Sequence, residues 1–234
     1  MGRRLEYRWG IVLPDFEEGA MAQKYAAVLF DLLTALLDSW TVWNRAAGSA
    51  EAGRKWRAQY LRLTYGCGAY RPYETLVAEA AEAVGLEAGC AGKLEASWDT
   101  LEAWPGVAQT LAALGKKHRL GIVTNCSERL GRRAATLTGM PFDVMVTSER
   151  AGFYKPDPRP YRLALAELGL APSRVLFVAG SGFDLIGTSR VGMNTFWHNR
   201  VGLARPPGAP APLRESERIE DVLALVNPTR HGAD

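Results

Sequence analysis

The sequence predicts an α/β fold, a doubly wound parallel sheet with an inserted all-helical cap. Five short apolar runs recur along the chain, each followed by a turn and a helical pattern. The runs are AAVLF at 26–30, LGIVT at 120–124, VMV at 144–146, VLFV at 175–178 and TFW at 195–197. Strands that alternate with helices in this way are typical of a parallel sheet covered on both faces.

Amphipathic segments between these runs predict the covering helices. Val107, Leu111 and Leu114 follow Pro105 at helical spacing, and Gly115 is placed to end that helix. Tyr161, Leu165 and Leu168 repeat this spacing after Pro160, which predicts that they face the core, and Gly169 is placed to end that helix. We expect the proline-rich stretch 203–213 to cross the surface before a last helix that contains Ile219 to Val226.

The interval 38–103 contains several helical patterns, no strand-like run and four of the seven tryptophans. We interpret it as an all-helical cap inserted after the first strand. The expected domain organisation is an N-terminal extension at 1–20, an α/β core at 21–37 and 104–228, and the cap at 38–103.

Composition restricts the function classes. The net charge is +3, and the basic residues are dispersed, so we expect no nucleic-acid partner. The three cysteines follow no metal-ligand spacing, which favours a reducing, cytoplasmic setting. The N-terminus has no signal-peptide pattern, and Asp31 interrupts the longest apolar stretch, so we expect no membrane span.

Polar residues end the predicted strands. Asp31 follows the first run, Thr124 and Asn125 end the second, Lys155 follows the third, and Ser181 and Asp184 follow the fourth. In an open parallel sheet, ligands bind beyond the carboxyl ends of the strands. We therefore expect these side chains to form one site.

Asp31 is the candidate nucleophile. A carboxylate at a strand end attacks covalently if a nearby cation such as Lys155 keeps it ionised. Asn125 and Thr124 offer hydrogen bonds to a substrate carboxylate or a developing charge, and Asp184 is suited to activating a water. The alternative for Asp31 taken alone is a helix N-cap.

At this point the residues resemble a known family, the haloacid dehalogenase superfamily. FDLLTALLD is similar to its first motif, IVTN to the second, YKPDPRPY to the lysine motif and VAGSGFDLIGTSRVGMNTFWHNR to the fourth. The resemblance runs from about Tyr25 to Leu203 in the family's order and spacing. It implies a Rossmann-like core fold and a hydrolase.

Leu33 distinguishes between branches of the family. The family's phosphatases carry a second aspartate at this position, which protonates the leaving alcohol and shapes a magnesium site. A leucine has no proton to donate. Its presence resembles the L-2-haloacid dehalogenase branch, which implies that no metal or other cofactor is needed.

Roles in that branch are carried over to matching positions. Asp31 is the nucleophile, Lys155 and Asp184 support ester hydrolysis, and Thr124 holds the substrate carboxylate with backbone amides after Asp31, such as that of Leu32. KWRAQYLRLT resembles the segment with the leaving-group arginine and nominates Arg57, which would act with Asn125. The alternative for Arg57 is a solvated position on a helix face.

Several positions depart from the branch. It usually has tyrosine at Leu33, serine at Ala179, asparagine at Ser181 and tryptophan at Phe183. These changes alter the pocket and put the substrate, more than the reaction type, in question. Trp40 and other cap aromatics are candidates for an apolar pocket wall, with packing of cap against core as the alternative.

We therefore expect hydrolysis of a small 2-substituted carboxylic acid, most closely an (S)-2-haloacid, through an aspartyl ester. Three alternatives stay open: opening of the azetidine-2-carboxylate ring by the same nucleophile, a small-metabolite phosphatase, and a non-catalytic binding protein. A homodimer is compatible with the apolar helical faces and the family resemblance.

Overall fold

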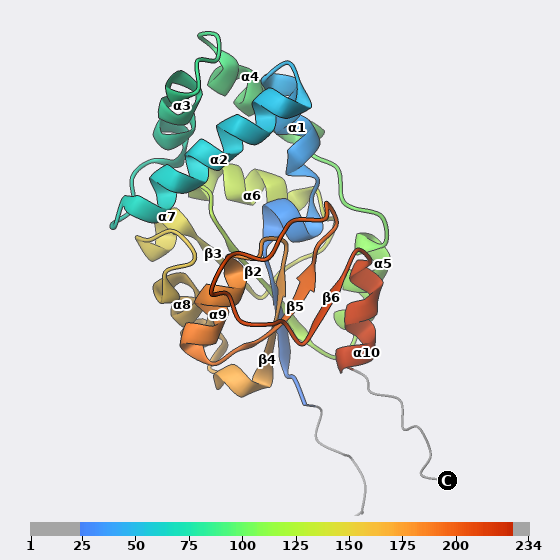
Figure 1. The fold of residues 1–234 in the computed structure, drawn as a ribbon. Coiled ribbons are helices and arrows are strands. Elements are labelled where there is room, and N and C mark those ends of the chain that lie inside the picture. Colours follow the sequence, from blue (N-terminus) through green and yellow to red (C-terminus); the bar gives the residue numbers. More distant parts are fainter. Residues whose placement is uncertain (1–23, 227–234) are drawn as a thin grey trace, which may run out of the picture.

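A computed structural model describes residues 24–226, and its centre is a six-stranded sheet (Figure 1). All strand pairs are parallel, in the order β3-β2-β1-β4-β5-β6. The strands are β1 (Ala27–Phe30), β2 (Arg119–Thr124), β3 (Val144–Thr147), β4 (Val175–Ala179), β5 (Asn194–His198) and β6 (Arg214–Ser216). The five predicted strands and the α/β fold class are confirmed.

Successive side chains of β1 supply the cores on the two faces of the sheet. Val28 and Phe30 pack with helices α5 (Val107–Leu114) and α6 (Glu128–Thr136). Ala27 and Leu29 belong to the opposite core, which includes α8 (Pro158–Leu168) and α9 (Asp184–Val191). Because strand side chains alternate between faces, a fully apolar strand is what a doubly wound sheet requires. Gly115 and Gly169 end α5 and α8 as predicted.

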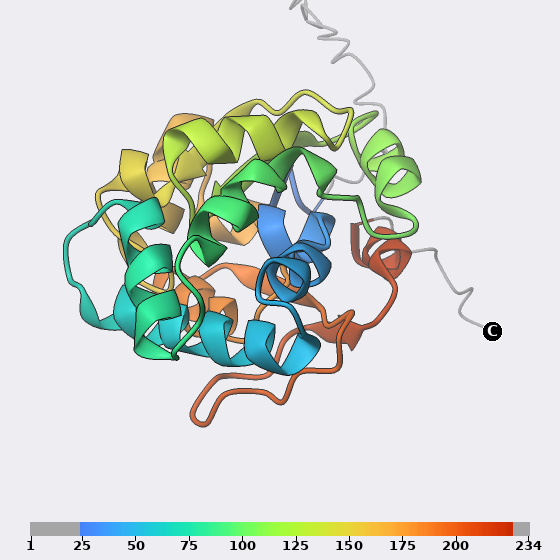
Figure 2. The same ribbon diagram turned by 90° about the horizontal axis from the view of Figure 1, so that it is seen from above.

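Four helices stand over the carboxyl edge of the sheet (Figures 1 and 2). They are α1 (Ser39–Ala46), α2 (Ala50–Gly66), α3 (Tyr73–Ala83) and α4 (Cys90–Ala96), followed by the short 3-10 turn η2 (Trp98–Thr100). Leu37 pairs with Ala103 where the chain leaves the core and returns. The described part of the chain contains no helix long and apolar enough to cross a bilayer. That this helical interval forms a separate domain stays a prediction.

The chain between β1 and α1 forms a tight turn that the sequence did not predict. It is a π-helical turn, η1 (Leu32–Leu36), and Asp31 is its N-cap. The Asp31 side chain accepts hydrogen bonds from the amides of Thr34 and Ala35. Asp31 is therefore an N-cap, and its additional role as a nucleophile stays a prediction.

The C-terminal segment differs from the expectation of a crossing followed by one helix. Arg214–Ser216 adds β6 to the sheet edge, and the Leu213 amide donates to the carbonyl of Thr195. These residues are polar and mostly exposed, so no apolar run marked them. The remaining short elements are α7 (Ser148–Ala151), η3 (Pro172–Arg174), η4 (Ile219–Val222) and α10 (Leu223–Val226). The predicted extension at 1–20 lies outside the described residues.

A substitution at Gly180 tests how closely η1 packs against the end of β4. A Cβ at this position would lie 2.3 Å from the amide nitrogen of Ala35 and from Thr34. We expect Gly180→Ala to lower the free energy of unfolding by about 1 to 3 kcal/mol, as overpacking does. Chemical denaturation measures this value. The control is Gly92→Ala in α4, where the Cβ meets open space, and there stability should stay level or rise. Equal effects at both positions would contradict the packing argument.

Candidate active site

The carboxyl ends of β1, β2 and β4 lie side by side and hold the predicted polar residues. Phe30 is in register with Ile122 on one side and Val178 on the other. Asp31 follows β1 directly, and Thr124 is the last residue of β2. Adjacent parallel strands thus bring their terminal residues to one edge of the sheet.

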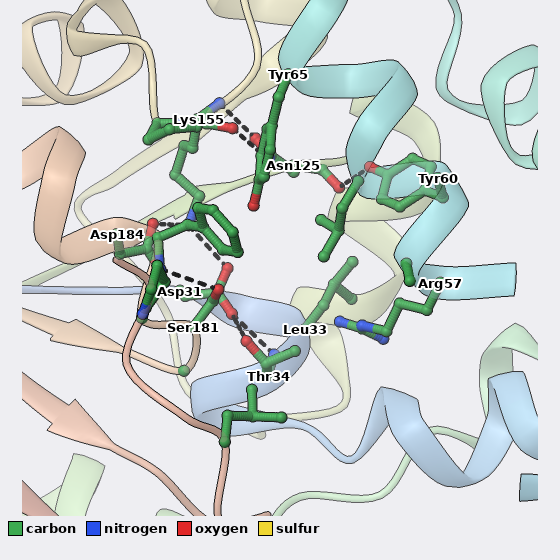
Figure 3. Close-up of a pocket in the computed structure, with 18 of the residues that line it drawn as sticks. Asp31, Leu33, Thr34, Arg57, Tyr60, Tyr65, Asn125, Lys155, Ser181 and Asp184 are labelled. Carbon is green, nitrogen blue, oxygen red and sulfur yellow. Dashed lines mark hydrogen bonds and ion pairs between the residues drawn. The ribbon is translucent and has the colours of Figure 1, made fainter. Parts of the chain in front are cut away.

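Lys155 lies between the two predicted carboxylates (Figure 3). Its Nζ is 2.9 Å from Asp31 Oδ1 and 3.0 Å from Asp184 Oδ1. The three residues are 4%, 6% and 3% exposed, respectively. A buried ammonium that contacts two buried carboxylates balances charge that would be costly to bury unpaired.

Thr34 engages the other oxygen of Asp31. Its hydroxyl donates to Asp31 Oδ2 at 2.5 Å and its amide donates at 2.8 Å. Burial raises the pKa of Asp31, but the charge of Lys155 and the Thr34 hydrogen bonds outweigh it, so the pKa lies below its usual value. Asp31 is therefore ionised, as a carboxylate nucleophile must be.

The pKa of Asp184 is shifted in the opposite direction from that of Asp31. Burial and the negative charge of Asp31 raise its pKa above the ordinary value, against the pull of Lys155. The two carboxylates retain the Lys155 proton, so the pKa of Lys155 is raised although burial acts against it. Two carboxylates with divergent pKa values are the pattern expected when one attacks and the other exchanges protons.

Tyr161 holds Asp184 in place. Its hydroxyl donates to Asp184 Oδ1 at 2.6 Å. Gly187 permits this approach, because a Cβ there would lie 2.3 Å from the Tyr161 ring. Asp184 Oδ2 is buried and has no hydrogen-bond partner among residues 24–226. This oxygen is the free acceptor that a bound water requires.

Asn125 holds the backbone of Lys155. Its Nδ2 donates to the Lys155 carbonyl at 3.0 Å, and its Oδ1 accepts from the Lys155 amide at 2.7 Å and from the Ser148 hydroxyl at 2.8 Å. The structure thus shows Asn125 positioning the lysine loop. Its contact with a leaving group stays a prediction.

The polar residues at the strand ends line a cavity of 310 Å³ between the sheet edge and α2. Ten predicted residues line it, namely Asp31, Leu33, Trp40, Arg57, Thr124, Asn125, Lys155, Ser181, Phe183 and Asp184. Leu32, the first residue of η1, does not line it, and its side chain is fully buried. Thr124 Oγ1 is a second buried oxygen without a hydrogen-bond partner in the described chain, available to a ligand.

Arg57 enters the cavity from α2, across Leu33 from Asp31 (Figure 3). Its guanidinium donates to Ser39 Oγ at 3.0 Å and lies 4.3 Å from the centre of the Trp40 ring. Stacking on an aromatic face orients the cation. The alternative of a solvated arginine on a helix face therefore does not describe this residue.

The sequence reasoning missed three contributions to the site. Thr34 acts through the unpredicted turn η1, and Tyr161 was assigned to a helix core by its spacing. Tyr65 reaches from α2 towards the centre of the cavity (Figure 3). Thr34 belongs to the first motif and lies three residues after Asp31. A contact between the N-cap residue and the residue three positions later is common at helix starts, and this spacing could have predicted the role of Thr34.

Removing the Lys155 charge should destabilise the fold and do so in a pH-dependent way. Without the ammonium, two carboxylates stay buried near each other, so Lys155→Met should lower the free energy of unfolding by about 3 to 5 kcal/mol near neutral pH. The pKa values of both carboxyls would then lie above their values in the unfolded chain, so the loss should shrink as the pH falls and they protonate. Denaturation at several pH values measures both effects.

The matched control is Lys117→Met, which removes an exposed lysine and should change stability by less than about 0.5 kcal/mol. A Lys155→Met loss that is small, or independent of pH, would mean that the ion pairs do not stabilise the fold.

Comparisons with known proteins identify the family of this chain. The haloacid dehalogenase-like hydrolase family matches residues 28–198. The chain is 28% identical to (S)-2-haloacid dehalogenase 4A of Burkholderia cepacia over 204 residues, 80% of this chain and 87% of that protein. It is 31% identical to (S)-2-haloacid dehalogenase 1 of Pseudomonas sp. (strain CBS-3) over 193 residues, 75% of this chain and 85% of that protein.

Solved structures give the same result for the fold. A dehalogenase crystal structure superimposes with a TM-score of 0.77 at 27% identity, covering 88% of this chain and 98% of that chain. An L-2-haloacid dehalogenase gives 0.75 at 27% identity, covering 87% and 99%. The resemblance to the L-2-haloacid dehalogenase branch is confirmed. The chain belongs to the haloacid dehalogenase-like hydrolase family and is a hydrolase.

Proposed function

We propose that the protein hydrolyses (S)-2-haloacids, with Asp31 as the covalent nucleophile. The observation that carries the proposal is the buried Lys155 ammonium in contact with both Asp31 and Asp184 at the wall of the cavity. The relatives named (S)-2-haloacid dehalogenases support the same substrate class.

In the first step, a carboxylate oxygen of Asp31 forms a bond to C2 of the substrate, and the carbon–halogen bond breaks with inversion. The halide leaves with the bonding electron pair and needs no proton, which agrees with the apolar Leu33 beside Asp31. Arg57 balances the developing halide charge. Thr124 Oγ1, which has no other partner in residues 24–226, orients the substrate carboxylate.

In the second step, water attacks the carboxyl carbon of the Asp31 ester. Asp184 Oδ2 accepts a proton from this water, since it is buried and otherwise unpartnered in the described structure. The bond between the carboxyl carbon and the oxygen attached to C2 then breaks. That oxygen takes the proton from Asp184 and leaves as the hydroxyl of the 2-hydroxy acid, and the second proton of the water passes to solvent, which restores the Asp31 carboxylate. Lys155 stabilises the charge that develops on Asp31 during the attack.

A single turnover in heavy-oxygen water tests the nucleophile. Excess enzyme with (S)-2-chloropropionate should place the label in the Asp31 peptide and leave the 2-hydroxy acid unlabelled, as mass spectrometry of both measures. Label in the product would mean that water attacks C2 directly. Asp31→Asn should remain folded and release no halide at the normal rate. A fully active Asp31→Asn enzyme would remove Asp31 from the mechanism.

The two carboxylates predict different pH dependences for the two steps. Asp31 stays ionised below its ordinary pKa of 3.8, whereas the pKa of Asp184 is raised above 3.8. As pH falls through the pKa of Asp184, ester formation should continue while ester hydrolysis slows. Intact mass after acid quench should then show the ester accumulating, and Asp184→Asn should accumulate it at neutral pH. Equal slowing of both steps would contradict these roles.

A second candidate reaction is the opening of azetidine-2-carboxylate by the same nucleophile. Breaking a carbon–nitrogen bond requires a proton on nitrogen, and Tyr65 lines the cavity with a phenol. Burial and the charge of Asp184 raise the pKa of Tyr65, so this phenol is a weak acid that stays neutral, and its oxygen can accept a hydrogen bond from a ring nitrogen that is already protonated. Turnover of azetidine-2-carboxylate in preference to 2-chloropropionate, lost in Tyr65→Phe, would favour this reaction.

A further inference from the structure

The cavity is larger than a three-carbon acid requires. Its volume of 310 Å³ reaches the range of about 300 to 1,000 Å³ that is typical of pockets for drug-sized ligands. A three-carbon haloacid has about six non-hydrogen atoms and would contact only part of such a lining. The remaining surface has to be matched by some other part of the substrate.

The lining outside the catalytic groups is mainly apolar and comes from three separate segments. Leu61 and Tyr65 project from α2, Phe183 follows β4, and Leu203 and Pro206 belong to the loop between β5 and β6. We call these five residues the apolar wall. The rings of Tyr65 and Phe183 are 4.7 Å apart between centroids, so α2 and the loop after β4 form one continuous surface.

The β5–β6 loop has hydrogen bonds of its own and packs on the loop after β4. Asn199 donates to the carbonyl of Leu203 at 2.8 Å and accepts from its amide at 2.7 Å. Pro206 packs on Gly182, where a Cβ would lie 2.5 Å from the proline ring. A wall that is formed before the ligand arrives costs little ordering on binding.

None of the five residues of the apolar wall carries a charge. Lys155 and the two carboxylates occupy the sheet edge, and Arg57 is stacked on Trp40. The only other charged side chain in the cavity lining of the described structure is Arg54, which is exposed. An apolar substituent therefore complements the wall better than a second carboxylate does.

We propose that the preferred substrate is a 2-substituted carboxylic acid with an apolar group of aromatic size beyond C2, bound against the apolar wall. This rests on the proposed function, in which Asp31 attacks C2 while Thr124 and Arg57 hold the carboxylate and the leaving group. The third substituent at C2 is then the part that contacts Leu61, Tyr65 and Phe183.

Binding of unreactive acids tests the proposal without any turnover. Propionate, hexanoate, 3-phenylpropionate and succinate are titrated into the whole protein by calorimetry. Each methylene buried on the wall should tighten binding by about fourfold, so hexanoate and 3-phenylpropionate should bind at least about tenfold more tightly than propionate. Equal affinities for propionate and hexanoate, or tightest binding of succinate, would overturn the proposal.

Turnover of the matching (S)-2-bromo acids gives the second readout. The ratio of kcat/KM for 2-bromo-3-phenylpropionate to that for 2-bromopropionate should be at least about ten. A ratio of one or less would overturn the substrate class. The expected affinity order with no bromide released from any acid would instead overturn the dehalogenase chemistry and leave the apolar site standing.

Two variants of α2 test whether the preference for the larger substrate arises at the apolar wall. Leu61→Trp should fill the space at the wall and lower that kcat/KM ratio at least about tenfold, with circular dichroism as the check on folding. The control is Leu63→Trp, which changes a leucine of the same helix that is also partly buried but does not line the cavity, and should leave the ratio unchanged. An equal fall in both variants would mean that the wall does not select the substrate. If Leu61→Trp does not fold, the affinity series still decides.

Discussion

The contact between the Lys155 ammonium and the carboxylates of Asp31 and Asp184 is the interaction on which the site depends. All three groups are buried, and each would be costly to bury alone. Together they satisfy one another and leave Asp184 Oδ2 unpartnered within residues 24–226. The charge balance that stabilises the folded state therefore also keeps Asp31 ionised and leaves one acceptor for a water molecule.

This arrangement requires contacts from distant parts of the chain, since Asp31 and Lys155 are 124 positions apart. The parallel sheet places the strand ends side by side, and the Asn125 amide fixes the backbone of Lys155. Gly180 and Gly187 allow the close approach of η1 and of Tyr161. The positions of the side chains in this site therefore follow from the sheet topology and from the close contacts at these two glycines.

The apolar surroundings restrict the chemistry. Leu33 supplies no proton beside the nucleophile, which suits a leaving group that departs as a stable anion. The phenol of Tyr65 stays protonated in the same cavity. It is the group that would contact the nitrogen in the alternative ring-opening reaction, in which the leaving group is basic. In the proposed function the apolar wall selects the substrate away from the reacting carbon, so that reaction type and substrate size would depend on different residues.

The strands, the order of the motifs and the meeting of Asp31, Lys155 and Asp184 at one edge of the sheet could be predicted from the sequence. This was possible because buried parallel strands are continuous apolar runs, and the polar residue after each run necessarily lies at the binding edge.

The remaining features depend on packing between distant segments. Tyr161 has the spacing of a core residue, and packing beside Gly187 alone brings its hydroxyl to Asp184. The polar residues of β6 become a strand only because the edge of β5 offers unpaired backbone groups. The size of the cavity likewise depends on how α2 and the β5–β6 loop pack over the sheet. No local sequence pattern encodes the separation between these two segments.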